Sequence, residues 1–460
     1  MNTQSLIHQV GHYKREFAEK IFTGGQQIIS IEKVKAVAGR IGYSYRVRHW
    51  PPWLTMLAFL TQSLEQDQSC RNAVAKIWAW LTASGQKLGS TDTGVYCDAR
   101  NRLPEKLISE FAAGEARELE SAVQDKDLWH GRRVRIVDGG CVSMPDTPEN
   151  QKAYPQPSEQ KKGCGFPMAR IVAMFSLCTG AILGLQIGSL HDAELVLSHG
   201  LWPLLSAGDI LLGDRGFCGY ADIYLLAKRG ADTVFRLHQR RKLDFRKGKK
   251  LGNNDYVVSL KKCTRPSWLD KRIFRQMPDQ LTLRAIRFTV DIPGFRSRRI
   301  TIITTLLDPI AYPPEDLIAL YRDRWQCELD FRSVKSVMKM DVLRCKTPQM
   351  VRKEISIHLL AYNMIRELMY QAALRTGQPV RRLSFKGTLQ ALNSVLPLMI
   401  LSPPRTRRIL LELLLNFISR QHVPFRPNRL EPRALKRRPK GYSLLNKPRH
   451  ELRRRKRNDP

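Results

Sequence analysis

Residues 321–335 have the sequence YRDRWQCELDFRSVK, and they are the most informative stretch of this 460-residue chain. On an α-helix with about 100° between residues, four of them share one narrow face, at about 0°, −60°, −20° and −40°. These four are Tyr321, Arg324, Glu328 and Lys335. Arg332 joins them at about +20°, whereas Asp323 and Asp330 point to the opposite side. One carboxylate among cations and a phenol is typical of a phosphate-binding surface with a single metal ligand; an ordinary solvated helix surface is the alternative.

Two aspartates that follow predicted strands supply further carboxylates. Residues 133–137 alternate like a strand and lead into Asp138, and the short strand 209–213 leads into Asp214. Taken singly, Asp138 fits a turn and Asp214 fits a helix cap. Mg²⁺ needs two or more carboxylates, and three carboxylates at one point repel one another unless cations lie between them. We therefore expect Asp138, Asp214 and Glu328 to be catalytic metal ligands for Mg²⁺, with Mn²⁺ as a substitute. Three rival aspartates are assigned to a turn, a helix cap and a strand edge: Asp146, Asp192 and Asp209.

The charge of the chain agrees with chemistry on a polyanion. Lys plus Arg exceed Asp plus Glu by 77 − 42 = 35 residues, and the sequence pI is about 10.2. This excess is too large for a neutral metabolic enzyme and favours nucleic acid over an anionic membrane as the partner. Two metal ions about 4 Å apart would activate a water or a 3′-hydroxyl and stabilise the leaving oxygen of a phosphodiester. The sequence therefore predicts phosphoryl transfer on nucleic acid.

Cysteine and histidine patterns exclude other classes. The nine cysteines and ten histidines show no metal-ligand or disulfide spacing, which predicts reduced thiols in a cytosolic protein. No secretory signal is expected at the start. The uncharged run 171–190 is long enough to cross a bilayer, but polar residues interrupt it and Cys178-Thr179-Gly180 favours a turn. We expect a buried β-hairpin there and no membrane partner.

The periodicity of the chain predicts an α/β protein in five parts. Residues 1–130 are helical, either a DNA-end-binding module or a plain packing domain. Residues 131–240 form the first part of a mixed sheet flanked by helices, and 241–299 form a β-rich insertion rather than a continuation of that sheet. Residues 300–375 return to the core with the Glu328 helix. Residues 376–460 are helical and then basic, and the tail from Arg420 to Pro460 is expected to be disordered without DNA, where it either contacts phosphates or is simply solvated.

The three acidic blocks resemble those of a known family, the DDE transposases of bacterial insertion sequences. Tyr321, Arg324, Glu328 and Lys335 match, without a gap, the Y-(2)-R-(3)-E-(6)-K signature of its branch called insertion-sequence family four. VDGG at Asp138 is similar to the family's first block, usually VDGT, and GDRGF is similar to its second. Segments similar to family sequence also occur at 90–104 (STDTGVYCDARNRLP) and 431–449, so the resemblance covers most of the chain.

The resemblance implies a fold and a set of roles. It implies a ribonuclease-H-like catalytic core in which the three carboxylates bind Mg²⁺, and it implies that Tyr321, Arg324, Arg332 and Lys335 contact DNA phosphates. Trp268, the only tryptophan of the insertion, would hold a flipped base or would serve ordinary packing. The partners implied are double-stranded DNA, as terminal inverted repeats and target, and a second copy in a synaptic homodimer. The implied location is the bacterial cytoplasm, associated with the nucleoid.

The predicted function is therefore that of a DNA transposase that cleaves strands at its element's ends and joins them to target DNA. One alternative is a metal-dependent nuclease of the same fold that cuts without joining. The other is an inactive DNA-binding derivative, against which the three intact carboxylates argue.

Overall fold

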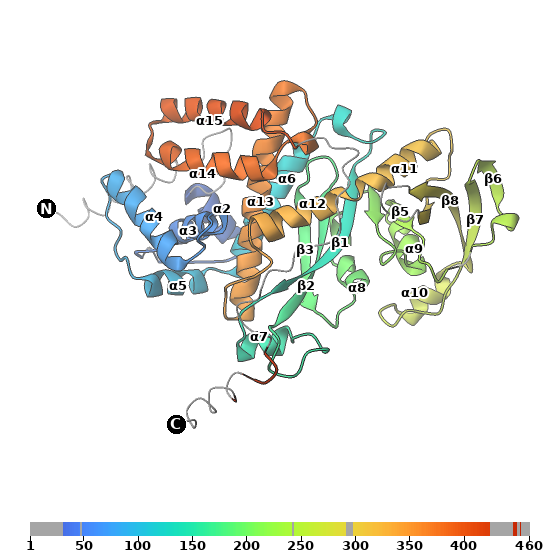
Figure 1. Cartoon of the computed structure of the whole chain (residues 1–460), viewed down its shortest axis with the longest axis horizontal. Helices are drawn as coiled ribbons and strands as arrows, with labels where there is room; N and C mark the ends of the chain where they lie inside the picture. Colours follow the sequence, from blue (N-terminus) through green and yellow to red (C-terminus); the bar gives the residue numbers. More distant parts are fainter. Residues whose placement is uncertain are drawn as a thin grey trace. The chain divides into compact units, whose positions relative to one another are not determined.

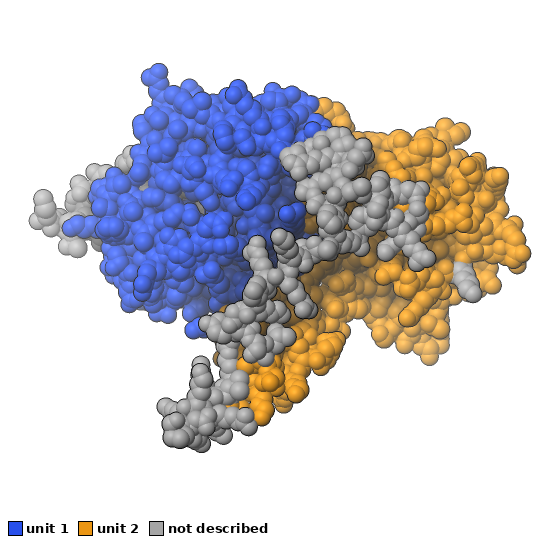
Figure 2. Space-filling model, in the orientation of Figure 1, with its two compact units in different colours: residues 1–123, 179–182, 330–423 blue, residues 124–178, 183–329, 424–460 orange. Residues whose placement is uncertain are grey.

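The computed structural model describes residues 31–46, 48–241, 243–290, 298–423, 445–448 and 451. The chain forms two compact units, shown in blue and orange in Figure 2. Unit 1 comprises residues 1–123, 179–182 and 330–423, and unit 2 comprises residues 124–178, 183–329 and 424–460. Each unit therefore combines segments that are distant in the sequence. The predicted five-part division remains a prediction, and most of the predicted basic tail, together with residues 1–30, lies outside the described residues.

Unit 2 is built on one mixed sheet (Figure 1). Within the described residues it has nine strands in the order β3-β2-β1-β4-β5-β9-β8-β7-β6. The strands are β1 (Val134–Ser143), β2 (Met168–Ser176), β3 (Ile182–Ser189), β4 (Ile210–Gly213), β5 (Asp232–Arg236), β6 (Lys249–Gly252), β7 (Asp255–Lys261), β8 (Gln280–Val290) and β9 (Arg298–Thr304). Only the pairs β1–β4 and β4–β5 are parallel among the strand pairs with a described register. The predicted mixed sheet is confirmed.

The expected separation of the insertion from the main sheet is wrong. Residues 241–299 are β-rich as expected, but β9 pairs with β5 of the core and with β8, so β6 to β8 extend the same sheet. Local sequence patterns do not indicate this pairing, because the pairing depends on which strand edge β9 meets. The buried ion pair between Arg284 and Asp255 then fixes β8 to β7, with Arg284 Nε 2.9 Å from Asp255 Oδ1.

Unit 2 also contains short helices. They are α7 (Pro148–Ala153), α8 (Glu194–His199), α9 (Tyr220–Lys228), α10 (Lys271–Gln276) and α11 (Pro314–Asp323), followed by the start of α12 (Gln326–Arg332). Of these helices, α8, α9 and α11 contact the strands of the sheet. Buried apolar side chains of β1, β2, β4 and α9 form one core with those of β7 and β8 in the insertion. The hairpin expected at 171–190 is confirmed by β2 and β3, and Gly180 occupies the turn with φ +76°. Among the described residues no helix is long and apolar enough to cross a membrane.

Unit 1 is helical. Its helices are α2 (Ile31–Arg40), α3 (Pro52–Leu64), α4 (Cys70–Ala83), α5 (Thr93–Arg102), α6 (Glu105–Ser121), α13 (Pro348–Thr376), α14 (Phe385–Leu401) and α15 (Pro404–Ser419). The long helix α13 packs on α3, α6, α14 and α15 and supplies much of the core. Its Asn363 side chain bonds both backbone groups of Ile182, with the Ile182 N–H donating across 2.9 Å and the carbonyl accepting across 2.9 Å. The described parts of the predicted N-terminal and C-terminal helical regions, residues 31–123 and 376–419, are largely helical.

Two predicted caps differ in the structure. Asp192 does not cap α8; its carboxylate instead accepts the Ser189 N–H and hydroxyl, which closes the turn before the helix. The sequence also predicts Ser90-Thr91 as the cap of a helix that runs to Arg102; in the structure this helix is α5, which begins at Thr93, and Asp92 is its N-cap, accepting from Gly94 N across 2.8 Å. Both aspartates are preferred turn and cap residues, so the residue type alone did not separate the two roles.

Candidate active site

The register of the sheet brings the two aspartates together. Parallel pairing aligns Ile136 of β1 with Leu212 of β4, so two residues further on Asp138 occupies the position that corresponds to Asp214. Asp214 follows the end of β4, as predicted. Asp138 does not follow the end of its strand, because β1 continues to Ser143 through antiparallel pairing with β2. The carboxylate thus lies in mid-strand, just where the parallel ladder stops and the backbone of the neighbouring strand leaves the sheet.

The third carboxylate lies on a broken helix. The single helix predicted for 321–335 is wrong: α11 ends at Asp323, Arg324 and Trp325 form a turn, and α12 begins at Gln326 (Figure 1). Backbone bonds tighten there, with Arg324 N donating to Tyr321 O and Glu328 N donating to Trp325 O. A helical wheel assumes the same rotation at every residue. Because the turn at Arg324 and Trp325 changes this rotation, the narrow common face predicted for the four signature residues is not kept.

Arg324 links two of the predicted metal ligands. Its Nη2 lies 3.3 Å from Glu328 Oε1, and its Nη1 lies 3.9 Å from Asp138 Oδ2. The Asp138 side chain is 19% exposed and the Glu328 side chain is 38% exposed. Cys327, which is buried, donates its thiol hydrogen to Asp138 Oδ2 across 3.2 Å, and Gly139 N donates to Oδ1 across 3.0 Å. The start of α12 is therefore tied directly to the middle of β1.

Electrostatics also group the carboxylates. Burial raises the pKa of Asp138, against the opposing hydrogen bonds from Cys327 and Gly139, and Asp214 raises it further. Burial raises the pKa of Glu328, Arg324 opposes this, and both Asp138 and Asp214 add to the rise. Each charge resists the ionisation of the next, so the cluster favours bound cations. Asp214 itself accepts the Gly216 N–H at 2.6 Å, which orients its carboxylate.

Sequence reasoning missed a fourth carboxylate, Glu194, the first residue of α8. Burial raises its pKa, Arg170 opposes this, and both Asp138 and Asp214 raise it again, so it faces the same cluster. Room for it comes from Gly139, because a Cβ there would lie only 2.4 Å from Glu194 Cδ. Arg170 Nε lies 3.8 Å from Glu194 Oε1. The sequence signal that could have indicated a neighbouring side chain is the small residue Gly139 beside Asp138. The sequence does not show that this neighbour is Glu194.

Tyr321 and the remaining signature residues fall in different places. Tyr321 is buried in unit 2, where burial raises its pKa while Arg324 and Arg236 oppose this. Its phenol lies near enough to Asp214 to be affected by that charge. Arg332 is exposed and Lys335 is half-buried, and both belong to unit 1, Lys335 in a π-helical segment, Ser333–Val337. The structure therefore groups Tyr321, Arg324 and Glu328 with the aspartates of unit 2.

Two other acidic or aromatic residues of the prediction have structural roles. Asp330 is fully buried and paired with Arg366 and Arg381 of its own unit, which agrees with its placement away from the functional face. Trp268 is half-buried, and its ring centroid lies 4.3 Å from that of His199. His199 in turn contacts Asp222, with 2.7 Å between Nε2 and Oδ1. These contacts support the packing alternative for Trp268.

The donor chemistry suits a hard divalent cation. Carboxylate oxygens are the ligands that Mg²⁺ prefers, and the space at Gly139 keeps a further carboxylate beside Asp138. As they stand, no three acidic, histidine or cysteine side chains in the described ranges lie close enough to share one ion. The guanidinium of Arg324 lies between Asp138 and Glu328, so its displacement would let these carboxylates converge on a cation.

Two adjacent parallel strands carry the aspartates, and a following helix carries the glutamate. In a strongly basic chain, this arrangement defines a class of metal-dependent phosphoryl-transfer enzymes that act on nucleic acid. The family model for the transposase DDE domain matches residues 129–364. The chain belongs to this family and is a DDE transposase of the insertion-sequence type. Enzymes of this family generally use divalent metal ions, and their substrate is DNA.

Two transposases of Escherichia coli and one solved structure are similar to this chain. The chain is 26% identical, over 318 residues, to the transposase InsG for insertion sequence element IS4 of Escherichia coli (strain K12), covering 68% of this chain and 70% of that protein. It is 24% identical, over 267 residues, to the transposase for insertion sequence element IS421 of Escherichia coli, covering 52% of this chain and 66% of that protein. A cryo-EM structure of the piggyBac transposase synaptic complex with hairpin DNA covers 88% of this chain at 10% identity, with a TM-score of 0.41.

Proposed function

We propose that this transposase cleaves DNA strands at the ends of its element and joins the 3′-hydroxyls to target DNA, with Asp138, Asp214 and Glu328 as Mg²⁺ ligands and Mn²⁺ as a substitute. The observation that carries the proposal is the register match between Asp138 and Asp214, with Glu328 linked to Asp138 through Arg324. When bound, a pair of metal ions would activate the attacking oxygen and stabilise the leaving oxygen.

The protein's own residues orient this chemistry. Cys327 and the Gly139 N–H hold the Asp138 carboxylate, and the Gly216 N–H holds that of Asp214. Arg324 contacts both Asp138 and Glu328, and as metal binds to these carboxylates the guanidinium would leave them and bind a DNA phosphate instead. Tyr321 and Arg324 would contact phosphates of the element end, while Arg332 and Lys335 would extend the contact along the same chain segment.

The strand order supports a ribonuclease-H-like core. The five strands β3-β2-β1-β4-β5 form the sequence order 3-2-1-4-5, with β2 antiparallel to β1 and with β4 and β5 parallel to it. This order supports the fold expected from the family resemblance. The Y-R-E-K spacing of residues 321–335 supports placement in the branch called insertion-sequence family four. A cytoplasmic, nucleoid-associated location is proposed with the function.

An exposed apolar stripe supports a homodimer. Ile409, Leu413 and Phe417 recur every four residues on α15 and are 52%, 59% and 53% exposed. A stripe of this kind on a surface helix marks a protein contact. We propose that a second copy of the chain covers it in the DNA-bound assembly. Light scattering on a synaptic complex with element ends would show two copies, and Leu413→Glu would leave one.

The experiment that tests the function follows strand cleavage and strand transfer on a labelled duplex carrying a flanked element end, with Mg²⁺. Glu328→Gln should bind the duplex but neither cut nor join it. Asp323→Asn, a neutralised carboxylate on the same segment but outside the cluster, serves as the matched control and should cut and join like wild type. Cutting without joining by wild type would favour the nuclease alternative, and wild-type activity in Glu328→Gln would exclude the metal site.

A further inference from the structure

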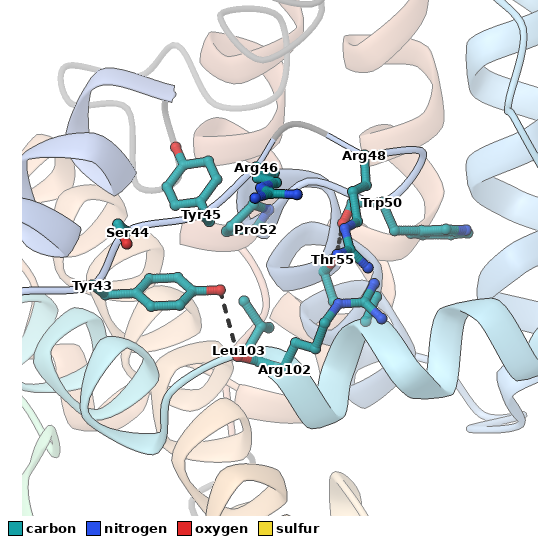
Figure 3. Close-up of a pocket in the computed structure, with 11 residues that line it drawn as sticks. Tyr43, Ser44, Tyr45, Arg46, Arg48, Trp50, Pro52, Thr55, Arg102 and Leu103 are labelled. Carbon is teal, nitrogen blue, oxygen red and sulfur yellow. Dashed lines mark hydrogen bonds between the residues drawn. The ribbon is translucent and has the colours of Figure 1, made fainter.

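A basic, aromatic cavity lies in unit 1, within the helical N-terminal segment. It has a volume of about 550 Å³ and is lined by the loop between α2 and α3, the start of α3 and the end of α5 (Figure 3). Trp50, Pro52 and Leu103, all buried, form its apolar part. The residues that give it chemical character are Tyr43, Tyr45, Arg46, Arg48 and Arg102. A cavity with an apolar base and a few polar groups is the usual form of a ligand site.

The local sequence explains how these side chains are displayed. Helix α2 ends at Arg40, and Gly42 with φ +70° turns the chain, after which Tyr43 N donates to Ala38 O across 2.8 Å. Residues 43–46 have no regular hydrogen-bonded structure, and their exposure alternates. Tyr43 and Tyr45 are half-buried on the cavity side, whereas Arg46 is exposed. Tyr43 is fixed by its hydroxyl, which donates to the Arg102 carbonyl across 3.4 Å (Figure 3).

The cavity concentrates positive charge. Arg46, Arg48 and Arg102 are exposed, and none of the residues that line the cavity is acidic. None of the ion pairs within the described part of the chain involves any of these three arginines. Three guanidinium groups around one cavity repel one another, and an anion between them would remove that repulsion. Phosphate is an anion whose geometry and charge match guanidinium groups.

The two tyrosines add a second requirement for the ligand. Their ring centroids lie 5.6 Å apart with an interplanar angle of 30°, so the rings form a small aromatic surface beside the arginines. Phosphates of an intact duplex need no aromatic surface, because the bases are stacked inside the helix. An unpaired nucleotide has a free base face and a phosphate within one unit, which is the combination that aromatic and arginine side chains bind in single-stranded DNA.

We infer that this cavity binds an unpaired nucleotide of a DNA strand, with its base on Tyr43 and Tyr45 and its phosphates on Arg46, Arg48 and Arg102. The inference rests on the proposed function, because that function supplies DNA strands with unpaired positions when ends are cut and joined. The cavity would add a contact with single-stranded DNA in unit 1, made by residues that do not belong to the carboxylate cluster.

The test is fluorescence anisotropy of a labelled oligothymidylate and of a blunt duplex of unrelated sequence, each at two salt concentrations. Wild type should bind the single strand more tightly than the duplex. Arg46→Gln/Arg48→Gln should weaken single-strand binding at least about tenfold and lower the slope of log affinity against log salt by about 0.7 for each lost contact. Tyr45→Leu should weaken it about 5-fold or more, whereas Tyr45→Phe should not.

Matched controls separate this site from general charge and from catalysis. Arg71→Gln/Arg117→Gln removes the same charge from exposed positions of the same unit outside the cavity and should keep single-strand affinity. Binding is measured without a divalent ion and without strand cleavage, so a failure of the catalytic proposal leaves this result unchanged. The inference is overturned if Arg46→Gln/Arg48→Gln binds as tightly as the control pair. It is also overturned if that variant loses duplex and single-strand affinity equally, or if Tyr45→Leu matches Tyr45→Phe.

Discussion

The thiol of Cys327 donates to Asp138 Oδ2 across 3.2 Å, although the two residues are 189 positions apart in the chain. Cys327 directly precedes Glu328, so this one bond sets the distance between the β1 carboxylate and the start of α12. The side chain is fully buried and the bond lies inside the protein, where solvent does not compete with it.

Cys327→Ala should therefore slow strand cleavage without abolishing it. Loss of one hydrogen bond of about 1 kcal/mol that positions Asp138 corresponds to about a 5-fold fall in rate. Cys327→Ser restores a donor and should recover most of the rate, whereas a purely space-filling role would let Ala and Ser behave alike. Single-turnover cleavage of an element end is the measurement, with the thermal unfolding midpoint as a check that both variants are folded.

Glu194→Gln should have two opposite effects on stability. The fold raises the pKa of Glu194, so the ionised carboxylate destabilises the folded state at neutral pH, and this cost is absent at a pH below the ordinary glutamate value. The neutral variant should therefore unfold at a higher temperature than wild type when no divalent ion is present.

With Mn²⁺ added, the order of the unfolding midpoints of wild type and Glu194→Gln should change. The ion stabilises wild type by binding the carboxylate cluster, and Glu194→Gln should show a smaller upward shift of its unfolding midpoint. Glu149→Gln, a neutralised exposed glutamate of α7, should show the wild-type shift. Equal Mn²⁺ shifts for Glu194→Gln and wild type would place Glu194 outside the metal site.

Asp330→Asn should destabilise the protein strongly. Asp330 is 0% exposed and receives Arg366 and Arg381, so the variant leaves two guanidinium groups without their carboxylate. Removing one partner of a buried ion pair costs about 3–5 kcal/mol in the free energy of unfolding. Urea unfolding measures this cost. Glu412→Gln breaks the exposed pair with Arg375 and should leave the midpoint unchanged, and equal effects of the two variants would contradict the argument.

Cys97 should be the most reactive thiol of the chain below pH 7. Its sulfur lies 3.7 Å from that of Cys70, and the Arg100 Nη2 lies 3.3 Å from Cys70 Sγ and 3.5 Å from Cys97 Sγ. The hydrogen bond between Cys97 and Cys70, and then the charge of Arg100, lower the pKa of Cys97 to about 6 although burial and Asp98 oppose this. Because the pKa is lowered, its thiolate should be mostly formed at pH 7 and lost as the pH falls through about 6.

Alkylation followed by peptide mass spectrometry measures this reactivity. The rate at Cys97 should rise between pH 5 and pH 7 and then level off, whereas a thiol of ordinary pKa, about 8.5, keeps gaining rate above pH 8. Cys164, a half-buried cysteine of the same chain, is the internal control. Cys70→Ser should slow Cys97 at pH 6 because it changes the hydrogen bond that contributes most to the shift. Parallel pH profiles for Cys97 and Cys164 would contradict the prediction.

Most elements followed from local patterns. Strands such as β4 and β8 and helices such as α3 and α13 have local residue patterns that indicate the type of element without distant contacts. The same patterns did not show that β9 joins β5, because any exposed strand edge offers the same backbone groups. They also predicted one unbroken helix for residues 321–335. Helix propensity does not record the turn at Arg324 and Trp325, and the side chain of Arg324 links Asp138 of β1 to Glu328.

The sequence by itself determined the chemistry of this protein: three carboxylates in ordered blocks, the Tyr321 to Lys335 spacing, and a net charge of +35 that selects a polyanion. Tertiary structure decided which groups meet. Strand register places Asp138 beside Asp214, the space at Gly139 admits Glu194, and the loop after α2 joins α5 around the arginine cavity. The physical reason is that residue types and local periodicity are encoded over a few positions, whereas register, helix breaks and cavities arise only when distant segments pack.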